Sequence, residues 1–481
     1  MHDITVVNLN LLYIRYFDTI DRERHVPLGP LYVTSALEKA GFSVDFRDYQ
    51  MVSAEDPFDS SVMADFLENP APVLGVSAMT NLLPFTILAL KEFKERYPEV
   101  TVIMGGVGTK AIEKEILSSF PWIDIIVRGE GELTSVELLK TLKNGGNLKD
   151  VKGITFRDNG YIIENPDRER ITDLNSSLWP AFHRINLSDY KGYGMVTSRG
   201  CPYPCTFCSV APIWGLTPYF RSDESIISEM KYLHDKSGVK LFLFQDEFFL
   251  SSQKRVLSFC KSLKEAGLNI KWKAFGRIDL TDRITMEEMA GSGCIEIRFG
   301  IESGSDRVLK RTKKGFISEE SAKVITEAVQ IFPRVDAFFV WGFPFEDMED
   351  FYQSVFQMIS FRMMGARILP SLLCLLPQTE IYKEYKDRAK LEFCENLFPE
   401  YMITGHEVSN YINISISEKY RYIFDFIKSY PNLFPGFFHI DLKNNIFPKL
   451  EILRQYGFYP SDLSKETDTE SCGAHSPVIG V

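Results

Sequence analysis

Three of the chain's eight cysteines lie close together in the segment SRGCPYPCTFCSV, residues 198–210. Cys201, Cys205 and Cys208 follow the spacing C-x3-C-x2-C. Thiolates at such short spacing on one loop can converge on a single metal centre. The remaining cysteines are scattered, and we expect ordinary thiols at Cys260, Cys294, Cys374, Cys394 and Cys472.

Two kinds of metal centre fit a cysteine loop. A structural zinc site needs a fourth ligand, usually a cysteine or histidine in a second short pair. The nearest histidines, His183 and His234, have no partner at such a spacing. A 4Fe–4S cluster has four iron corners, so three protein thiolates leave one iron open to a small molecule. The missing fourth ligand therefore favours a catalytic cluster over zinc.

Residues 191–375 alternate between strands and helices. The expected strands are GMVTS, KLFLFQ, IKWKAFG, CIEIRFGIE, VDAFFVWGF and RILPSLLCLL. Six strands with intervening helices predict a complete or partial α/β barrel similar to a TIM barrel. Such barrels carry their chemistry at the carboxyl ends of the strands, and the cysteine loop directly follows the first strand.

The cysteine loop, with Phe207 before its last cysteine, resembles the signature loop of the radical S-adenosylmethionine superfamily. In that superfamily the amino and carboxylate groups of S-adenosylmethionine bind the open iron. One electron then cleaves the sulfonium and yields methionine and a 5′-deoxyadenosyl radical. The resemblance implies that Cys201, Cys205 and Cys208 hold the cluster and that Phe207 lies at the S-adenosylmethionine site.

Two later segments also resemble S-adenosylmethionine-binding parts of the superfamily. QDEFF ends the second strand, and the resemblance places Gln245, Asp246 and Glu247 where an ammonium group is met. A surface acidic loop is the alternative for this segment. GIESGSD ends the fourth strand, and there the resemblance implies that Glu302 accepts hydrogen bonds from the ribose hydroxyls, assisted by Ser303.

VWGFPFED resembles the fifth-strand segment whose backbone edge meets adenine, and it brings Trp341 into the expected site. Phe345 replaces the family's usual glycine and Asp347 its usual threonine, which leaves Glu346 without an assigned role. Arg277, which ends the third strand, could pair with a carboxylate of the ligand or could tie loops together.

Residues 1–150 show another alternation of strands and helices, which predicts a doubly wound, Rossmann-like parallel sheet. The run ITVVNLNLLYI, residues 4–14, is expected to be a single buried strand. The helix GPLYVTSALEKAG that follows is stopped by Gly41. Loops after the later strands are rich in glycine, which permits a ligand to approach the backbone closely.

Four segments in this region resemble the cobalamin-binding domain of cobalamin-dependent radical S-adenosylmethionine enzymes. They are HVPLGPLYVTSALEKAGFSVDF, VLGVSAMTNLLPF, VIMGGVGTK and IDIIVRGEGEL. The resemblance covers roughly residues 1–375. It implies cobalamin contacts for Leu28, Gly29, Thr80, Asn81, Gly105, Gly106, Gly108, Thr109, Gly129, Glu130, Gly131 and Glu132.

The glycine loops could instead serve a dinucleotide or simply turn a corner. However, the chain has neither G-x-G-x-x-G nor a P-loop motif, which disfavours ordinary nucleotide binding. It also lacks the Asp-x-His-x-x-Gly motif with which cobalamin mutases and methionine synthase supply a histidine to cobalt. We therefore expect no protein histidine on the lower face of the cobalt.

Two further regions complete the chain. Residues 151–190 read as a connector that opens with a hairpin turning at Asp158-Asn159-Gly160. Residues 376–481 are richer in aromatic residues than the 13% of the whole chain, which predicts a mainly helical cap with an aromatic core and a flexible tail. A pocket for an apolar substrate or a contact with a membrane surface is the alternative explanation of these aromatic residues.

Composition restricts the partners. The chain has 481 residues, 45% of them hydrophobic, and a net charge of −11, so it lacks the basic surface typical of nucleic-acid binding. No apolar run reaches the roughly 20 residues that span a bilayer. The first residues do not resemble a secretory signal. We expect a cytoplasmic protein.

The family resemblance implies a cobalamin-dependent radical enzyme that methylates an unactivated carbon of a small or lipid-like substrate. One S-adenosylmethionine would supply the methyl group through cobalamin and a second the radical, with electrons from a donor such as flavodoxin or ferredoxin. Two alternatives stay open. The same cofactors could perform an oxidative cyclisation or rearrangement, or the chain could be a non-catalytic cobalamin or redox sensor.

Overall fold

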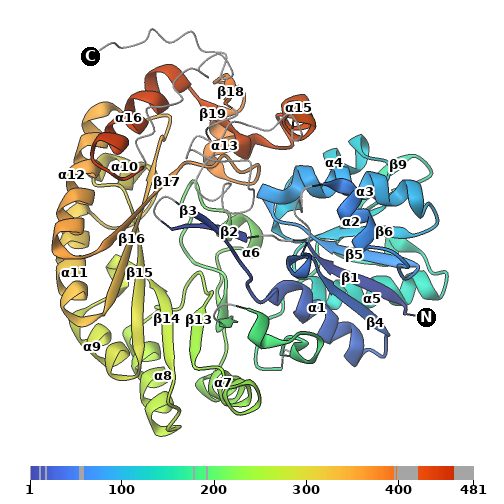
Figure 1. Ribbon diagram of the computed structural model, residues 1–481, viewed down its shortest axis with the longest axis horizontal. Coiled ribbons are helices and arrows are strands. Elements are labelled where there is room, and N and C mark those ends of the chain that lie inside the picture. Colours follow the sequence, from blue (N-terminus) through green and yellow to red (C-terminus); the bar gives the residue numbers. More distant parts are fainter. Residues whose placement is uncertain are drawn as a thin grey trace.

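The computed structural model contains two sheets of mainly parallel strands that lie side by side, each with its own helices (Figure 1). The structure describes residues 2–9, 12–16, 19–53, 59–176, 179–190, 193–394, 397 and 421–459. No helix within these ranges is both long enough and apolar enough to cross a membrane.

The first sheet is doubly wound, as the sequence predicts. Its strand order is β4-β1-β5-β6-β7-β8-β9. The parallel strands are β4 Val44–Asp48, β1 Ile4–Asn8, β5 Val73–Ser77, β6 Thr101–Gly105 and β7 Ile125–Val127. The winding reverses between β1 and β5, and in such sheets the ligand crevice lies outside the carboxyl ends of the strands at that point.

Helices cover both faces of this sheet. They are α1 Leu28–Lys39, α2 Ser60–Phe66, α3 Leu83–Arg96, α4 Glu113–Ser119 and α5 Gly131–Lys143. Helix α1 packs beside α5, and α2 packs beside α3. Because side chains alternate along a strand, Ile4 and Val6 join one apolar cluster with residues of α1 and α5, whereas Val7 joins the cluster on the opposite face.

The first strand is shorter than the sequence predicts. The sheet strand β1 ends at Asn8, where its parallel partners β4 and β5 end at Asp48 and Ser77. Leu12–Tyr16 forms the separate strand β2, which pairs antiparallel with β3, Thr19–Glu23. The prediction of one strand over residues 4–14 was wrong because an apolar run does not reveal where its neighbouring strands end.

The expected hairpin is present and lengthens the first sheet. Strands β8 Ile154–Asp158 and β9 Tyr161–Glu164 pair antiparallel, and β8 also pairs antiparallel with β7. Asn159 and Gly160 form the turn with φ of 48° and 84°, which is the conformation of the primed hairpin turns. The opening part of the predicted connector therefore continues the first sheet.

The second sheet has six parallel strands that are adjacent in chain order. They are β10 Tyr193–Met195, β13 Leu241–Phe244, β14 Lys271–Gly276, β15 Cys294–Glu302, β16 Arg334–Trp341 and β17 Arg367–Leu372. Within the described residues β10 and β17 are the two edge strands of this sheet, so this part of the chain forms a partial α/β barrel, one of the two forms that the sequence predicts.

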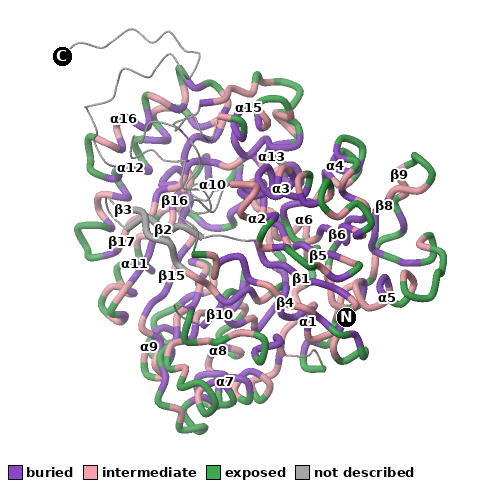
Figure 2. The backbone as a smooth tube through the Cα atoms, turned by 45° about the vertical axis from the view of Figure 1, so that its right-hand side comes forward, coloured by how far each residue is buried: buried purple, intermediate pink, exposed green. Residues whose placement is uncertain are grey.

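An outer layer of helices covers the convex face of the second sheet (Figure 1). It consists of α7 Asp223–Ser237, α8 Gln253–Glu265, α9 Arg283–Gly291, α11 Ser318–Ile331 and α12 Met348–Met364. Buried residues run through both sheets, and exposed residues lie on the outer helices and loops (Figure 2). The alternate side chains of the strands, such as Phe275 and Phe338, face the concave side and are half-buried.

The described C-terminal part adds short elements around the carboxyl ends of both sheets. They are α13 Glu380–Tyr385, β18 Leu391–Phe393, α15 Arg421–Ser429, β19 Phe438–Ile440 and α16 Phe447–Gln455, with β18 and β19 paired antiparallel. Phe426 and Tyr430 pack on Phe120 of the first domain at 5.6 and 5.1 Å between ring centroids. The predicted tail over residues 461–481 lies outside the described residues.

Candidate cofactor site between the two sheets

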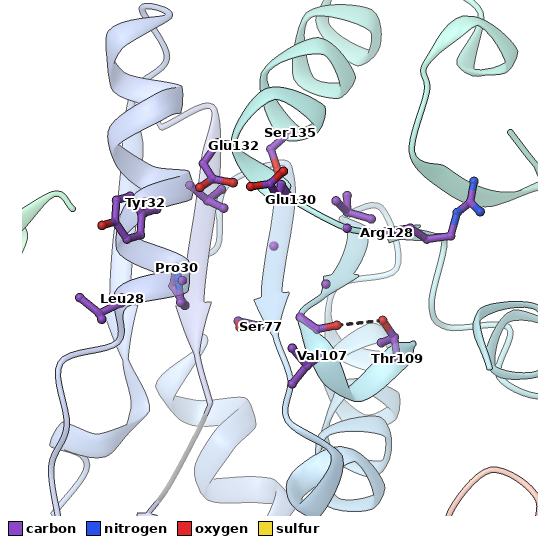
Figure 3. Close-up of a pocket in the computed structure, with 18 of the residues that line it drawn as sticks. Leu28, Pro30, Tyr32, Ser77, Val107, Thr109, Arg128, Glu130, Glu132 and Ser135 are labelled. Carbon is purple, nitrogen blue, oxygen red and sulfur yellow. Dashed lines mark hydrogen bonds between the residues drawn. The ribbon is translucent and has the colours of Figure 1, made fainter. Parts of the chain in front are cut away.

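A pocket lies between the carboxyl ends of the strands of the first sheet and the carboxyl ends of β10 and β13, the first two strands of the second sheet. Figure 3 shows the wall that belongs to the first domain, with Leu28 and Tyr32 on α1 and Glu130 and Glu132 at the start of α5. The opposite wall consists of Val196, Ser198, Arg199, Ile213, Trp214, Gln245 and Glu247. The pocket therefore joins the domain predicted to bind cobalamin to the strands that flank the cysteine loop.

Most of the residues expected to contact cobalamin line this pocket. They are Leu28, Gly29, Gly105, Gly106, Thr109, Gly129, Glu130, Gly131 and Glu132. Thr80, Asn81 and Gly108 are not among the lining residues. A Cβ on Gly108 would lie 2.7 Å from the carbonyl carbon of Met79, so this glycine permits two loops of the first domain to pack together.

Glycine is required at the pocket's floor for a steric reason. Gly106 has φ of +96°, and a Cβ there would lie 2.7 Å from the carbonyl oxygen of Ala78. Its carbonyl oxygen accepts a hydrogen bond of 3.2 Å from the Thr109 hydroxyl, the dashed line in Figure 3. A floor made largely of backbone suits a ligand that needs close approach over a wide area, which fits cobalamin.

Several lining residues were not predicted from the sequence. Ile4 and Val6 extend the pocket along β1, and Tyr32 and Ser77 add polar atoms. The alternation of Ile4 and Val6 within β1 would have indicated that they share one face. Arg199 carried only a weak signal, its position two residues before Cys201.

Arg199 connects the two walls of the pocket through a buried ion cluster. Its Nη1 lies 2.6 Å from Glu130 Oε1, and its Nη2 lies 2.7 Å from Glu132 Oε1. The side chains of Arg199 and Glu130 are only 8% and 6% exposed. Burial opposes the charge on Arg199, but the carboxylates outweigh it and raise the pKa of Arg199 above its ordinary value.

The segment that leads into the cysteine loop is hydrogen-bonded to a buried carboxylate, that of Asp246. Asp246 Oδ1 accepts hydrogen bonds from the backbone N–H groups of Thr197 and Ser198 and, at 2.8 Å, from the Ser198 hydroxyl. Asp246 is 2% exposed, and burial raises the pKa of its carboxyl to about 6. This side chain supports the loop from below, whereas its neighbours Gln245 and Glu247 line the pocket.

The middle of the cysteine loop is hydrogen-bonded to the barrel and to α13. The backbone N–H of Thr206 donates to the carbonyl of Thr312, and the carbonyl of Thr206 accepts from the N–H of Ile381. Phe207 packs edge-on against Phe343 with ring centroids 5.7 Å apart. The expected S-adenosylmethionine contact at Phe207 therefore has a rigid apolar backing.

The three cysteines lie on this loop as partly exposed free thiols. Burial raises the pKa of Cys201, and it raises that of Cys208 to about 12, while the cations Arg277 and Lys314 oppose the rise at Cys201. In the described ranges no three His, Cys, Asp or Glu side chains are already gathered around a point that could hold a metal. Cluster binding would require the thiols to lose their protons.

Glu302, expected to bind ribose, lies at the end of β15 in a strained conformation. Its φ is +68°, which is uncommon for a residue other than glycine, and the pairing of β15 with β16 shifts register beside it. Its Oε1 pairs with Lys314 Nζ at 2.7 Å, and a Cβ on Gly300 would overlap this carboxylate at 2.4 Å. Backbone strain at such a point is typical of functional sites.

Two neighbouring candidates have structural partners. The hydroxyl of Ser303 lies 2.9 Å from that of Ser354 on α12, and Ser303 is fully buried. Arg277 pairs with Asp279 at 2.9 Å, and its guanidinium carbon lies 3.4 Å from the ring centre of Tyr203 in the cysteine loop. Of the two roles considered for Arg277, tying loops together is the one these contacts support.

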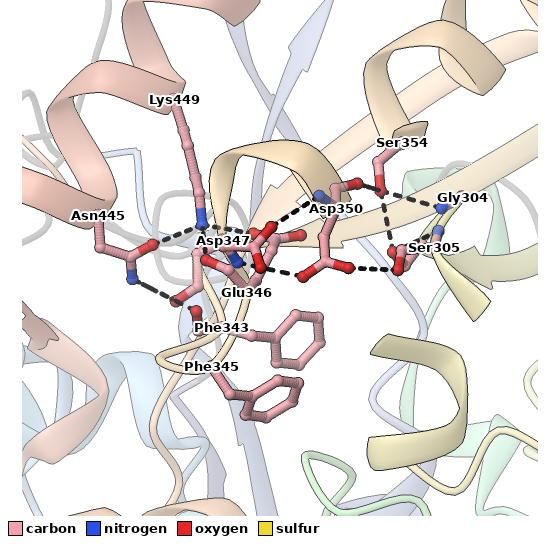
Figure 4. Close-up of polar contacts among 12 residues, drawn as sticks. Gly304, Ser305, Phe343, Phe345, Glu346, Asp347, Asp350, Ser354, Asn445 and Lys449 are labelled. Atoms are coloured by element: carbon pink, nitrogen blue, oxygen red, sulfur yellow. Dashed lines mark hydrogen bonds and ion pairs between the residues drawn. The ribbon is translucent and has the colours of Figure 1, made fainter. Parts of the chain in front are cut away.

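The segment after β16 is held from the C-terminal helix, as Figure 4 shows. Lys449 Nζ of α16 lies 2.7 Å from Glu346 Oε2, and both side chains are buried. Burial raises the pKa of Glu346, and Lys449 opposes that rise. The indole of Trp341 is also buried and donates to the Tyr459 hydroxyl at 3.1 Å, so its ring packs in the core.

Comparison with known proteins agrees with this arrangement. Residues 195–358 match the Radical SAM superfamily, and residues 22–139 match the B12 binding domain. An uncharacterized methyltransferase of Pyrococcus horikoshii is 30% identical over 331 residues, which cover 67% of this chain and 71% of the relative.

The chain belongs to the cobalamin-dependent radical S-adenosylmethionine enzymes. An anaerobic magnesium-protoporphyrin IX monomethyl ester cyclase of Synechocystis is 27% identical over 71% of this chain and 69% of the relative. The radical S-adenosylmethionine methyltransferase TsrM of Kitasatospora setae has the same fold, with a TM-score of 0.65 at 16% identity over 81% of this chain and 75% of that chain.

The enzyme's cofactors are accordingly a 4Fe–4S cluster, S-adenosylmethionine and cobalamin. Cys201, Cys205 and Cys208 would hold the cluster, and the backbone-lined floor around Gly105 and Gly106 would hold cobalamin.

Replacement of one loop cysteine should abolish the cluster. We expect Cys205→Ala to lower the iron content of anaerobically reconstituted protein from about four atoms per chain to below one, because two thiolates do not hold a cubane. Iron and sulfide analysis and visible absorbance measure the loss. Cys374→Ala, which removes a thiol outside the loop, should retain the iron, and equal iron in both variants would contradict the assignment.

Replacement of the floor glycine should weaken cobalamin binding. The Cβ of Gly106→Ala would meet the Ala78 carbonyl, so the loop must shift, and we expect the Kd for hydroxocobalamin to rise by about 10-fold or more. Gly145→Ala is the matched control, because Gly145 also has a positive φ of 62° but has open space around its Cβ position. If both variants bind equally, the close approach at Gly106 does not serve the ligand.

Removal of Lys449 should destabilise the protein by leaving Glu346 charged and unpaired. We expect Lys449→Met to cost about 3–5 kcal/mol near pH 8 and less near pH 5, because burial raises the pKa of Glu346 above that of the unfolded chain and so favours its neutral form as the pH falls. Thermal unfolding at the two pH values measures the effect. Adding Glu346→Gln should restore part of the loss, and Lys264→Met, which breaks an exposed pair with Glu288, should cost less than about 1 kcal/mol.

Proposed function

We propose that this enzyme methylates an unactivated carbon of a small or lipid-like substrate. The observation that carries the proposal is the shared pocket, in which the corrinoid-side loops face residues adjacent to the cysteine loop. When bound, the cofactors supply a carbon-centred radical and a methyl group. Methyl transfer requires both to reach one substrate atom, and this pocket provides a common space for them.

The proposed reaction balances with two molecules of S-adenosylmethionine and two electrons. One molecule gives up its methyl group and leaves as S-adenosylhomocysteine. The second is cleaved to methionine, and the substrate's hydrogen ends on 5′-deoxyadenosine. The substrate C–H bond is replaced by C–CH3, and a flavodoxin- or ferredoxin-type donor supplies both electrons.

The role of the chain's own residues is to position and to shield. The Glu302 carboxylate, fixed by Lys314, is the acceptor we assign to the ribose hydroxyls. Gln245 and Glu247 lie at the end of β13 on the pocket wall, and Glu247 accepts a 3.0 Å hydrogen bond from the Trp214 indole. The indole of Trp214 also forms part of that wall, where it limits access of water to the reacting atoms.

The concave face of the second sheet carries apolar side chains that suit an apolar part of the substrate, beside an ion network formed by Lys273, Glu296 and Arg298. Phe275 and Phe338 lie there with ring centroids 6.1 Å apart, and Leu243 and Leu369 are half-buried on the same side of their strands. The aromatic surplus of the C-terminal part gives less support, because Phe393, Phe424 and their neighbours pack on one another as a core. The apolar surface that suits a lipid-like substrate therefore belongs to the barrel and not to the C-terminal part.

An oxidative cyclisation is the second candidate, and the similarity to the magnesium-protoporphyrin cyclase favours it. Both reactions begin with removal of a substrate hydrogen, and the protein geometry around the shared pocket serves either one. They differ in whether a methyl group is gained.

Isotope labelling separates the two candidates. The reconstituted enzyme is incubated anaerobically with a reductant, a cell extract and S-adenosylmethionine carrying a trideuterated methyl group. We expect a compound that gains one trideuteromethyl group in place of hydrogen, together with 5′-deoxyadenosine. A product that has lost hydrogens and carries no deuterium would reject methyl transfer and support cyclisation, and the Cys205→Ala variant provides the blank.

A further inference from the structure

The ion cluster around Arg199 spans the boundary between the two cofactor domains. Arg199 ends the short strand β11, Ser198–Arg199, and Gly200 alone separates it from Cys201. Glu130 directly precedes α5 and Glu132 lies in its first turn, so both carboxylates belong to the corrinoid side of the pocket. A shift of either loop is therefore transmitted to the other through charge-assisted hydrogen bonds.

The segment around Arg199 has contacts with the barrel, with the connector and with α1. Asp246 holds Thr197 and Ser198 from the barrel, as described above. The Arg199 carbonyl accepts a 3.0 Å hydrogen bond from Arg170 Nη2, and the guanidinium lies 5.1 Å from the ring centre of Tyr32 on α1. The start of the cysteine loop thus has its backbone fixed by one domain and its side chain fixed by the other.

Glu130 is itself fixed by a second contact. Its Oε2 accepts a 2.7 Å hydrogen bond from the backbone N–H of Ile171, while its Oε1 pairs with Arg199. Both oxygens of this carboxylate are thus engaged. The corrinoid-side loop at residues 129–132 cannot change its position without loss of one of these contacts or movement of Arg199.

We propose that Arg199 is a positioning residue that couples occupancy of the corrinoid site to the geometry of the cysteine loop. Cobalamin that settles against the Gly129–Glu132 loop sets the position of Glu130 and Glu132, and Arg199 and the cysteine loop follow these carboxylates through their ion pairs. S-adenosylmethionine, bound at the cluster, then meets the cysteine loop in the position that cobalamin favours. Each cofactor consequently strengthens binding of the other, by thermodynamic reciprocity.

The coupling is measured as a ratio of binding constants. The Kd for S-adenosylmethionine is determined on cluster-loaded protein with and without hydroxocobalamin, and we expect the native enzyme to bind on the order of 10-fold more tightly when cobalamin is present. In Arg199→Gln the ratio should fall to about 1 while the iron content stays at the native level. The electron paramagnetic resonance spectrum of the reduced cluster should likewise stop responding to cobalamin.

Two further variants keep the test decisive. Arg184→Gln breaks an exposed arginine–glutamate pair, with Glu38, and should leave the coupling at its native value. If Arg199→Gln fails to fold because Glu130 and Glu132 remain buried and charged, Arg199→Met combined with Glu130→Gln and Glu132→Gln removes the three charges together. Arg199→Lys should restore part of the coupling, since one cation remains but the two-pronged contact is lost.

A native enzyme without coupling, or an Arg199→Gln variant that retains it, would overturn the proposal. Loss of iron from Arg199→Gln in place of loss of coupling would show instead that Arg199 merely holds the loop together, and would also overturn it. The measurement uses cofactor binding alone, so its outcome is independent of whether the substrate is methylated or cyclised.

Discussion

Parallel strands end at a common edge, and in this protein two such edges face each other across one pocket. The start of α1, the end of β5 and the loops after β6 and β7 form one wall, and the segments after β10 and β13 form the other. The glycine loops of the first sheet meet Gln245 and Glu247 of the second in this pocket because each of them follows the carboxyl end of a strand. The carboxylate of Asp246 fixes the path of the chain between β10 and the cysteine loop, because it accepts hydrogen bonds from the backbone N–H groups of Thr197 and Ser198.

Holding two domains together at a cofactor site by buried charges is costly. Removing Arg199, Glu130 and Glu132 from water carries a desolvation penalty that their attraction only partly returns, so apolar residues of similar size would hold the domains as firmly or better. Charges differ from apolar contacts in their directionality, because a guanidinium fixes the orientation of two carboxylates at once. An active site that must align two cofactors needs the two domains held in a defined relative orientation, which explains why charged residues lie at this contact.

The parts of the structure that could be predicted are those encoded within a few residues. The cysteine spacing, the glycine loops and the strands of the second sheet are local patterns, and the structure places the glycine loops and Gln245 and Glu247 at one pocket. Thr80 and Asn81, which were expected to contact cobalamin, follow β5 but do not line the pocket. A family resemblance assigns a strand end, and the pleat of the strand then decides which of two neighbours faces the ligand.

The contacts that fix the site join residues far apart in the chain, and for that reason the sequence did not reveal them. Arg199 lies 69 residues from Glu130, and Lys449 lies 103 residues from Glu346. Nothing in a stretch of sequence marks two distant charges as partners, whereas folding pairs them because an unpaired charge in the interior is far more costly than a paired one. The two pairs fasten opposite ends of the barrel mouth, Arg199 to the corrinoid domain and Glu346 to the C-terminal helix. The mouth is thus held by elements outside the barrel.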